Sequence, residues 1–369
     1  MTMFASCAPG LEDLLVADLK KMSAGNITKL DGGAEFTGDF ETIVRANIRL
    51  GIAERVLLRL ETFKARFFDE LISQTEEIPF EQYICDNSVK IKVSATSAKS
   101  KIYHSKAAAE RVELAIKNRI RKFGQKSTQA GANIQNIFVR IEDDICTVSI
   151  DTSGDLLHKR GYKTATTDAP LRETVAFAAL MFSEYTAKVP LIDPMCGSGT
   201  LLTEAFALNK KIAPGTNRKF AFDNWPVADK DIIKKERLRA REYSIPFTGQ
   251  IAGSDISDKS IDAALINFKN LGIEDEILLS NKPVSSLTTD FIGPLIICNP
   301  PWGRRLNGEN LKKLESIYKD LGDFVRKTEN SRLCLITTNR KLAAATGIKF
   351  KQISPPVPLG GMRLKFYLS

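Results

Sequence analysis

Four consecutive residues combine a polar amide, a stiff backbone and a large aromatic ring: Asn299, Pro300, Pro301 and Trp302. They follow the short apolar run 295–298, which is typical of a buried strand. One proline is enough to end a strand, so the tetrapeptide suggests a chemical role. The Asn299 side-chain oxygen and the Pro300 carbonyl are two acceptors on a rigid backbone, and both could receive the N–H bonds of one amine.

This arrangement suits the exocyclic amine of a nucleobase. The lone pair of such an amine is delocalised into the ring, so the nitrogen is a poor nucleophile. Two acceptors favour a pyramidal nitrogen and stabilise the positive charge that grows on it. Trp302 offers a flat face on which an extruded base can stack. We therefore predict catalytic roles for Asn299, Pro300, Pro301 and Trp302; the alternative is a proline-stiffened turn with a tryptophan in the core.

A glycine-rich turn at 193–200, Asp-Pro-Met-Cys-Gly-Ser-Gly-Thr, lies between a strand-like run and a helix-like segment. Gly197 and Gly199 permit a tight turn that brings the backbone close to a ligand at a helix N-terminus. The dinucleotide fingerprint does not fit, because Leu202 stands at the third glycine position. A phosphate loop does not fit either, because no Gly-Lys-Ser/Thr follows. The turn therefore predicts a small cofactor without a pyrophosphate.

Three acids are expected at the ends of neighbouring strands: Asp193, Asp255 and Asp290. Doubly wound sheets bind ligands at this edge, where Asp255 could accept both hydroxyls of a ribose. Each acid alone could instead cap a turn or a helix. The predicted cofactor-binding residues are Asp193, Pro194, Cys196, Gly197, Ser198, Gly199, Thr200, Asp255, Ile256, Asp290 and Asn299.

The positive charge is concentrated in one stretch. The chain carries a net charge of +9, and residues 98–126 hold nine Lys/Arg and two Glu, a net +7. Helical spacing of the apolar residues in this stretch gives the cations a solvent-facing side. Such a side favours RNA phosphates, although an ordinary solvated helix looks the same. The predicted RNA-binding residues are Lys99, Lys101, Lys117, Arg121 and Lys122.

The composition, 43% hydrophobic and 26% charged, is that of a globular protein. No run approaches the roughly 18–20 apolar residues of a membrane span, and the N-terminal segment lacks a signal-peptide pattern. The six cysteines form no C-x-x-C pair, which indicates reduced thiols in the cytoplasm. His104 and His158 lie far apart without matching cysteines, so we expect no catalytic metal.

Three regions follow from the pattern of elements: 1–62, 63–160 and 161–369. The first alternates helices and strands in a small α+β unit, and the second holds the basic helix and a strand pair turning at Asp143–Asp144. The third alternates short apolar strands with helices, which predicts a parallel α/β sheet closed by an antiparallel hairpin. The charged insertion 223–241 is expected as a surface helix. Asp168 and Arg172, at the start of this region, could line the cleft or form a cap and an ion pair.

The glycine-rich turn followed by Asn299-Pro-Pro-Trp302 resembles the class I S-adenosylmethionine-dependent amino-methyltransferases. Residues 67–84, 99–116, 156–180 and 212–225 are similar to the bacterial RlmL-type guanine-N2 methyltransferases of large-subunit rRNA. The resemblance implies a ferredoxin-like unit (1–62), a THUMP RNA-binding domain (63–160) and a Rossmann-like methyltransferase domain (161–369). It also implies S-adenosylmethionine as cofactor and 23S rRNA as partner, in the cytoplasm. Longer members carry a second methyltransferase domain, for which this chain has no room.

Other functions share these motifs. Asn-Pro-Pro-aromatic also serves adenine-N6 methylation of nucleic acids and glutamine-N5 methylation of proteins, and THUMP-linked relatives modify tRNA guanines. The basic N-terminal module favours structured RNA. A non-catalytic RNA-binding assembly factor that keeps the fold is the alternative from another class.

Overall fold

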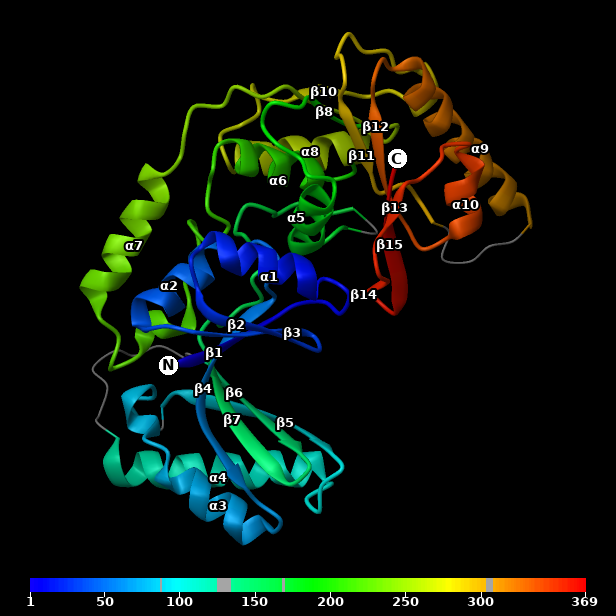
Figure 1. Cartoon of the computed structure of the whole chain (residues 1–369). Coiled ribbons are helices and arrows are strands. Elements are labelled where there is room, and N and C mark those ends of the chain that lie inside the picture. Colours follow the sequence, from blue (N-terminus) through cyan, green and yellow to red (C-terminus); the bar gives the residue numbers. More distant parts are fainter. Residues whose placement is uncertain (87, 125–133, 168–169, 303–307) are drawn as a thin grey trace.

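The computed structural model describes the chain except residues 87, 125–133, 168–169 and 303–307 (Figure 1). Its first sheet joins seven strands in the order β2-β3-β1-β4-β7-β6-β5. The N-terminal unit contributes β1 (Thr2–Ser6), α1 (Glu12–Lys21), β2 (Gly25–Leu30), β3 (Gly33–Thr37), α2 (Phe40–Arg49) and β4 (Arg55–Lys64).

The second unit continues the same sheet. It contains α3 (Phe68–Glu77), η1 (Phe80–Gln82), β5 (Lys90–Ala98), α4 (Ser105–Phe123), β6 (Ile134–Glu142) and β7 (Ile145–Asp151). β4 pairs with both β1 and β7, so the two units are fused through one strand. The predicted boundary between residues 62 and 63 falls inside β4, and the three domain ranges stay a prediction.

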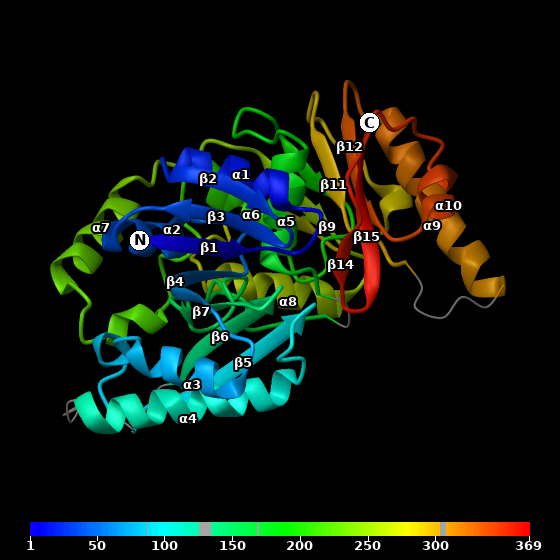
Figure 2. The same ribbon diagram turned by 60° about the horizontal axis from the view of Figure 1, so that its bottom comes forward.

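The predicted hairpin and basic helix of this unit are confirmed. β6 and β7 are antiparallel, and Asp143 and Asp144 turn between them with φ of 51° and 63°. α4 connects the parallel strands β5 and β6 and lies beside α3 on one face of the sheet (Figures 1 and 2). Its apolar residues, Val112, Ile116 and Ile120 among them, are buried. The helix therefore turns its cations outward.

The second sheet is the parallel sheet that the alternating pattern predicts. Five parallel strands form its centre: β10 (Leu278–Ser280), β9 (Ile251–Ser254), β8 (Leu191–Asp193), β11 (Leu295–Cys298) and β12 (Arg332–Thr337). The expected closing hairpin is confirmed, because β15 runs antiparallel to β12 and to the two short strands before it. These three strands are β13 (Gln352–Ile353), β14 (Val357–Leu359) and β15 (Met362–Leu368).

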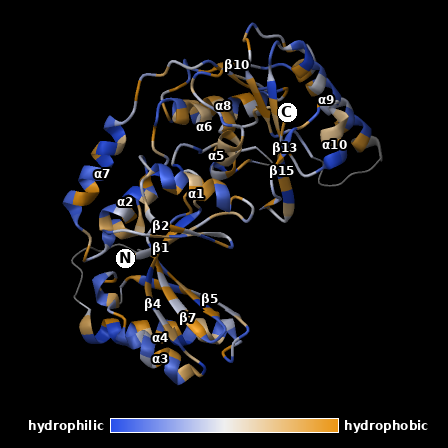
Figure 3. Cartoon of the chain, in the orientation of Figure 1, coloured by the Kyte–Doolittle hydropathy of each residue, from blue (hydrophilic) through white to orange (hydrophobic). Residues whose placement is uncertain are grey.

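Helices cover both faces of this sheet (Figure 1). One face carries α5 (Glu173–Phe182), α6 (Thr200–Asn209) and α8 (Asp258–Lys269), and the other carries α9 (Gly308–Lys327) and α10 (Arg340–Ala345). The central strands and α5 are among the most hydrophobic parts of the chain (Figure 3), as burial on both faces requires. β9 and β11 flank β8 on opposite sides, which opens a crevice at the carboxyl ends of these strands.

The charged insertion is a helix, as predicted, but it is not simply a surface element. η2 (Ala221–Asn224) precedes α7 (Lys230–Glu242), whose Ile233, Glu236 and Ala240 are buried. Arg45 of α2 lies 3.4 Å from the Glu236 carboxylate, and Arg239 lies 2.6 Å from it. The insertion thus fastens the unit that contains the second sheet to the N-terminal unit, a long-range contact that the charge pattern alone does not reveal.

Candidate active site

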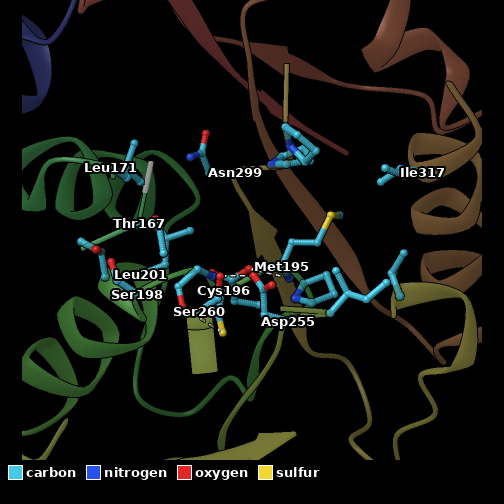
Figure 4. Close-up of a pocket in the computed structure, with 18 of the residues that line it drawn as sticks. Thr167, Leu171, Met195, Cys196, Ser198, Leu201, Asp255, Ser260, Asn299 and Ile317 are labelled. Carbon is cyan, nitrogen blue, oxygen red and sulfur yellow. Dashed lines mark hydrogen bonds between the residues drawn. The ribbon is translucent and has the colours of Figure 1, made fainter. Parts of the chain in front are cut away.

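A pocket of about 740 Å³ opens at the carboxyl ends of β8, β9 and β11 (Figure 4). The strand ends, the glycine-rich turn and α9 supply its lining. Most of the predicted site residues gather there, namely Asp193, Pro194, Cys196, Gly197, Ser198, Thr200, Asp255, Ile256, Asn299, Pro300, Pro301 and Trp302. Residues far apart in the sequence therefore form one cavity.

The glycine-rich turn needs its glycines for two different reasons. Gly197 and Gly199 both have positive φ, 53° and 78°. A Cβ on Gly199 would lie 2.6 Å from the Phe268 ring, so Gly199 lets the turn pack on α8 and lies outside the pocket lining. The Gly197 N–H donates to Asp255 Oδ2 at 2.9 Å, and the Cys196 N–H donates to the Ser254 carbonyl at 2.9 Å. These bonds fasten the turn to the end of β9.

Two carboxyl groups give this end of the pocket a negative character. Asp193 is 1% exposed, and its Oδ1 accepts the Met195 N–H at 3.1 Å. Burial, together with the neighbouring charge of Asp255, raises the pKa of Asp193 well above its usual range. A positively charged ligand would counteract this rise in pKa, because it stabilises the ionised carboxylate. The pair therefore suits a cation better than a phosphate.

Asn299 lies across the pocket from Asp255 (Figure 4). Its Oδ1 is buried and has no hydrogen-bond partner among the residues that the structure describes. Buried acceptors are nearly always paired, so an unpaired one that lines a pocket points to a ligand. Trp302 is half-buried, and its Nε1 donates to the Ile336 carbonyl of β12 at 3.2 Å. The ring is thus held in place at the pocket wall.

The expectation that Asp290 ends a strand is wrong. The strand before β11 is β10, which ends at Ser280, and the exposed Asp290 is outside the described lining of the pocket. The turn after β10, which includes η3 (Val284–Ser286), lines the pocket instead through Pro283, Val284 and Ser285. The strand is only three residues long, too short for its apolar pattern to stand out.

One residue that the sequence pattern missed holds the site together. Asn267 of α8 is fully buried, and its Oδ1 accepts the N–H groups of Thr164 and Ala165 at 3.0 and 3.1 Å. Its Nδ2 donates to the carbonyls of Ala165 and Ser198 at 2.9 and 3.0 Å. Asn267 therefore ties the glycine-rich turn to the segment that enters from the N-terminal units. An asparagine within a helix carries no sequence signal of such a role.

The predicted RNA-binding residues lie away from this pocket, on the second unit. Lys99, Lys101, Lys117, Arg121 and Lys122 are all exposed. Lys117 pairs with Glu113 at 2.6 Å, one turn away on α4. Arg172 forms an ion pair with Glu54 at 3.1 Å, and Asp168 lies outside the described residues. In the described part of the chain, no three metal-ligating side chains come together, and no helix is long and apolar enough to span a bilayer.

Comparison with known proteins agrees with this geometry. Three family models match: the RlmL ferredoxin-like domain at residues 2–57, the THUMP domain at 65–151 and the RMKL-like methyltransferase domain at 160–351. "Putative RNA methyltransferase YpsC" of Bacillus subtilis (strain 168) is 32% identical over 94% of this chain and 90% of its own length. A "Ribosomal RNA large subunit methyltransferase K/L" of Syntrophotalea carbinolica is 32% identical over 94% of this chain, which spans only 50% of that relative.

Among solved structures, SMU.472, described as a methyltransferase complexed with SAH, is 27% identical. The match covers 100% of this chain and 97% of that one, with a TM-score of 0.88. The chain belongs to the RMKL-like methyltransferases that carry RlmL-type ferredoxin-like and THUMP domains. It is an S-adenosylmethionine-dependent methyltransferase, and the negative pocket wall at Asp193 and Asp255 suits a positively charged cofactor.

Proposed function

We propose that this enzyme forms N2-methylguanosine in the 23S rRNA of the large ribosomal subunit, in the cytoplasm. The observation that carries the proposal is the buried Oδ1 of Asn299 at the pocket wall, which has no hydrogen-bond partner among the described residues. An amine is a ligand that would supply the missing donor. The similarity to relatives named for large-subunit rRNA supports the choice of RNA.

The pocket wall formed by the glycine-rich turn and the end of β9 holds the cofactor. Asp255, already ordered by the N–H groups of Gly197 and Ser257, accepts ribose hydroxyls with its remaining lone pairs. Asp193 faces the positive end of the ligand, and the exposed side chain of Ile256 gives an apolar surface for the adenine. S-adenosylmethionine, when bound, supplies the methyl group that the base nitrogen accepts. The conformation of this wall is fixed by the packing of Gly199 on α8 and by the hydrogen bond from Asn267 to the Ser198 carbonyl.

The opposite pocket wall, formed by residues 299–302 after β11, holds the base. Trp302 stacks on the extruded guanine, a contact worth about 1–3 kcal/mol. Asn299 Oδ1 and the Pro300 carbonyl accept the two N–H bonds of the exocyclic amine, which orients its lone pair and stabilises the positive charge that develops on nitrogen. The proton leaves to water after the transfer, so no general base is needed. Alignment of the amine supplies much of the remaining rate enhancement.

Mass spectrometry of nucleosides from a strain that lacks the gene tests the proposal. N2-methylguanosine should disappear from large-subunit rRNA and return when the gene is restored. Its loss from tRNA alone would replace rRNA with tRNA as the substrate. Loss of N6-methyladenine would keep the role of Asn299 and contradict the guanine assignment.

We also infer that the outward face of α4 contributes RNA affinity through phosphate contacts. Reversing Lys117, Arg121 and Lys122 to glutamate should weaken binding of large-subunit rRNA and flatten its salt dependence, because fewer counterions are released. Binding of S-adenosylhomocysteine should not change.

A matched control reverses three exposed lysines of α7, namely Lys230, Lys234 and Lys235. This triple changes the net charge of the protein equally. Equal loss of RNA affinity in both triple variants would mean that only the net charge matters. An unchanged salt slope in the α4 triple variant would mean that the outward face of α4 does not contact RNA.

A further inference from the structure

A second cavity, of about 530 Å³, adjoins the active-site pocket. The two cavities share Pro170, Leu171 and Trp302 as lining residues. The rest of the second lining comes from residues within 158–166, from Arg172 and Glu173, and from the hairpin of β14 and β15 through Leu359, Gly360 and Met362. Trp302, fixed by its bond to the Ile336 carbonyl, therefore contacts both spaces.

The two cavities differ in charge. The described lining of the active-site pocket includes Asp193, Asp255 and Asp320 but no lysine or arginine. The second cavity is lined by four cations, with Glu173 as the sole carboxylate in its described lining. The four cations are Lys159, Arg160, Lys163 and Arg172. One cavity thus suits a cationic ligand and its neighbour an anionic one.

Two of these cations are fixed in place. Arg160 is 5% exposed and donates to the carbonyls of Leu157 and Gly51 at 2.8 and 2.6 Å, with Glu204 at 3.5 Å. Lys163 donates to the Leu171 carbonyl at 2.7 Å and lies 3.8 Å from Glu173. Their carboxylate partners largely neutralise them, so they shape the cavity more than they attract a ligand.

The other two cations are free to change partner. Lys159 pairs with Asp155 at 3.3 Å, and both side chains are more than half exposed. Arg172, 42% exposed, pairs with Glu54 at 3.1 Å. Exposed pairs of this kind contribute little to stability, so a phosphate can replace the carboxylate at small cost. Arginine also binds phosphate through two parallel hydrogen bonds.

His158 lines the same cavity, and its pKa responds to the positive charge there. Its Nδ1 is buried without a partner in the described part of the chain. Burial, and then the charges of Arg172, Arg160, Lys159 and Lys163, lower the pKa of His158 to about 4. The ring is therefore neutral at pH 7 and keeps hydrogen-bonding capacity for an uncharged group such as a ribose hydroxyl.

We propose that this second cavity is a subsite for the nucleotide next to the methylated one, with Arg172 and Lys159 binding the phosphate between them. The proposal rests on the proposed extrusion of the base against Trp302. When one base of an RNA enters the active-site pocket, the RNA backbone must continue past Trp302. The second cavity lies on the other side of Trp302 and is lined by cations. Trp302 would then contact the target base from one space and its neighbour from the other.

The test uses the double variant Lys159→Ala/Arg172→Ala in single-turnover methyl transfer to large-subunit rRNA from a strain that lacks the gene. The RNA concentration for half-maximal rate should rise by about ten-fold or more per lost contact. The salt slope of RNA binding should fall by about 0.7–0.9 per contact. The affinity for S-adenosylhomocysteine, measured by calorimetry, should not change. Arg172→Lys should keep the salt slope, because the charge remains, but should lose part of the RNA affinity with the second parallel hydrogen bond.

The matched control, Lys29→Ala/Arg326→Ala, removes two exposed ion-paired cations elsewhere, bonded to Asp13 and Asp323. An unchanged half-saturation and salt slope in the subsite variant, or an equal change in the control, would overturn the subsite. So would a parallel loss of S-adenosylhomocysteine affinity, because the cavity would then only support the fold. A product other than N2-methylguanosine would refute the proposed function and not the subsite.

Discussion

Replacing Asn299 with alanine should separate stability from activity. The Asn299 Oδ1 forms no hydrogen bond with the described residues, so its removal breaks no hydrogen bond among them. Burying an unpaired polar group costs about 1–3 kcal/mol, and Asn299→Ala relieves part of that cost. The lost atoms border the pocket, so no closed void forms. The free energy of unfolding should therefore stay the same or rise by up to about 1 kcal/mol.

The rate of methyl transfer should fall strongly in the same variant. Loss of one preorganised transition-state acceptor reduces rates by about 10²–10³-fold, or roughly 2.7–4 kcal/mol. Affinity for S-adenosylhomocysteine should change little, because Asn299 lies across the pocket from Asp255. Trp302→Ala should weaken engagement of the base, whereas Trp302→Phe should retain much of the activity, since stacking needs only a flat ring.

The assay pairs urea unfolding with single-turnover transfer to large-subunit rRNA. Asn47 gives a contrasting control, because this buried side chain bonds Ile43, Thr152 and Ser153 at 2.6–2.9 Å. Asn47→Ala should destabilise the protein by about 1–3 kcal/mol, through the buried groups left unpaired, and keep the rate. Near-normal transfer by Asn299→Ala with cofactor bound would refute the mechanism, as would a stability loss that matches that of Asn47→Ala.

Three further predictions use calorimetry or denaturant unfolding. Asn267→Asp, which replaces two donated hydrogen bonds with repulsion, should weaken S-adenosylhomocysteine binding at least ten-fold. The control Asn209→Asp, at another buried asparagine, should not weaken it, and equal affinities of the two variants would mean that Asn267 does not position the cofactor site. Asp255→Ala should weaken the same binding about 10- to 100-fold, and unchanged affinity would remove Asp255 from the site. Burial raises the pKa of Asp18 to about 6. The folded state then holds this proton more tightly than the unfolded state, so stability falls as pH rises from about 4 to 6. Asp18→Asn should flatten that slope and add about 3 kcal/mol at pH 7, whereas an unaltered slope would contradict the prediction.

Local patterns in the sequence predict the parts of the site that rest on local chemistry. Asn299-Pro-Pro-Trp302 and the glycine-rich turn each combine a strand end with unusual backbone, so their positions at one sheet edge follow from the fold class. The basic helix is also local, because its apolar spacing decides which side the cations occupy. The specific function of each site residue stays a prediction until it is measured.

Long-range contacts explain what local patterns do not predict. Asp290 looks like an acid at a strand end, but the short β10 ends ten residues earlier. Asn267 and the inner face of α7 acquire their roles only when distant segments pack against them. Local sequence does not predict the fusion of two units through β4 either, because strand pairing is decided between segments far apart in the chain. The second cavity beside Trp302 arises in the same way.

Transfer of labelled methyl groups to purified RNA tests the central claim most directly. The purified protein is incubated with labelled S-adenosylmethionine and rRNA from a strain that lacks the gene, and the labelled nucleoside is identified by mass spectrometry. The account predicts that the label appears as N2-methylguanosine in 23S rRNA, and that Asn299→Ala transfers it about 10²–10³-fold more slowly. Label in another nucleoside, in tRNA alone, or at an equal rate in Asn299→Ala would contradict it.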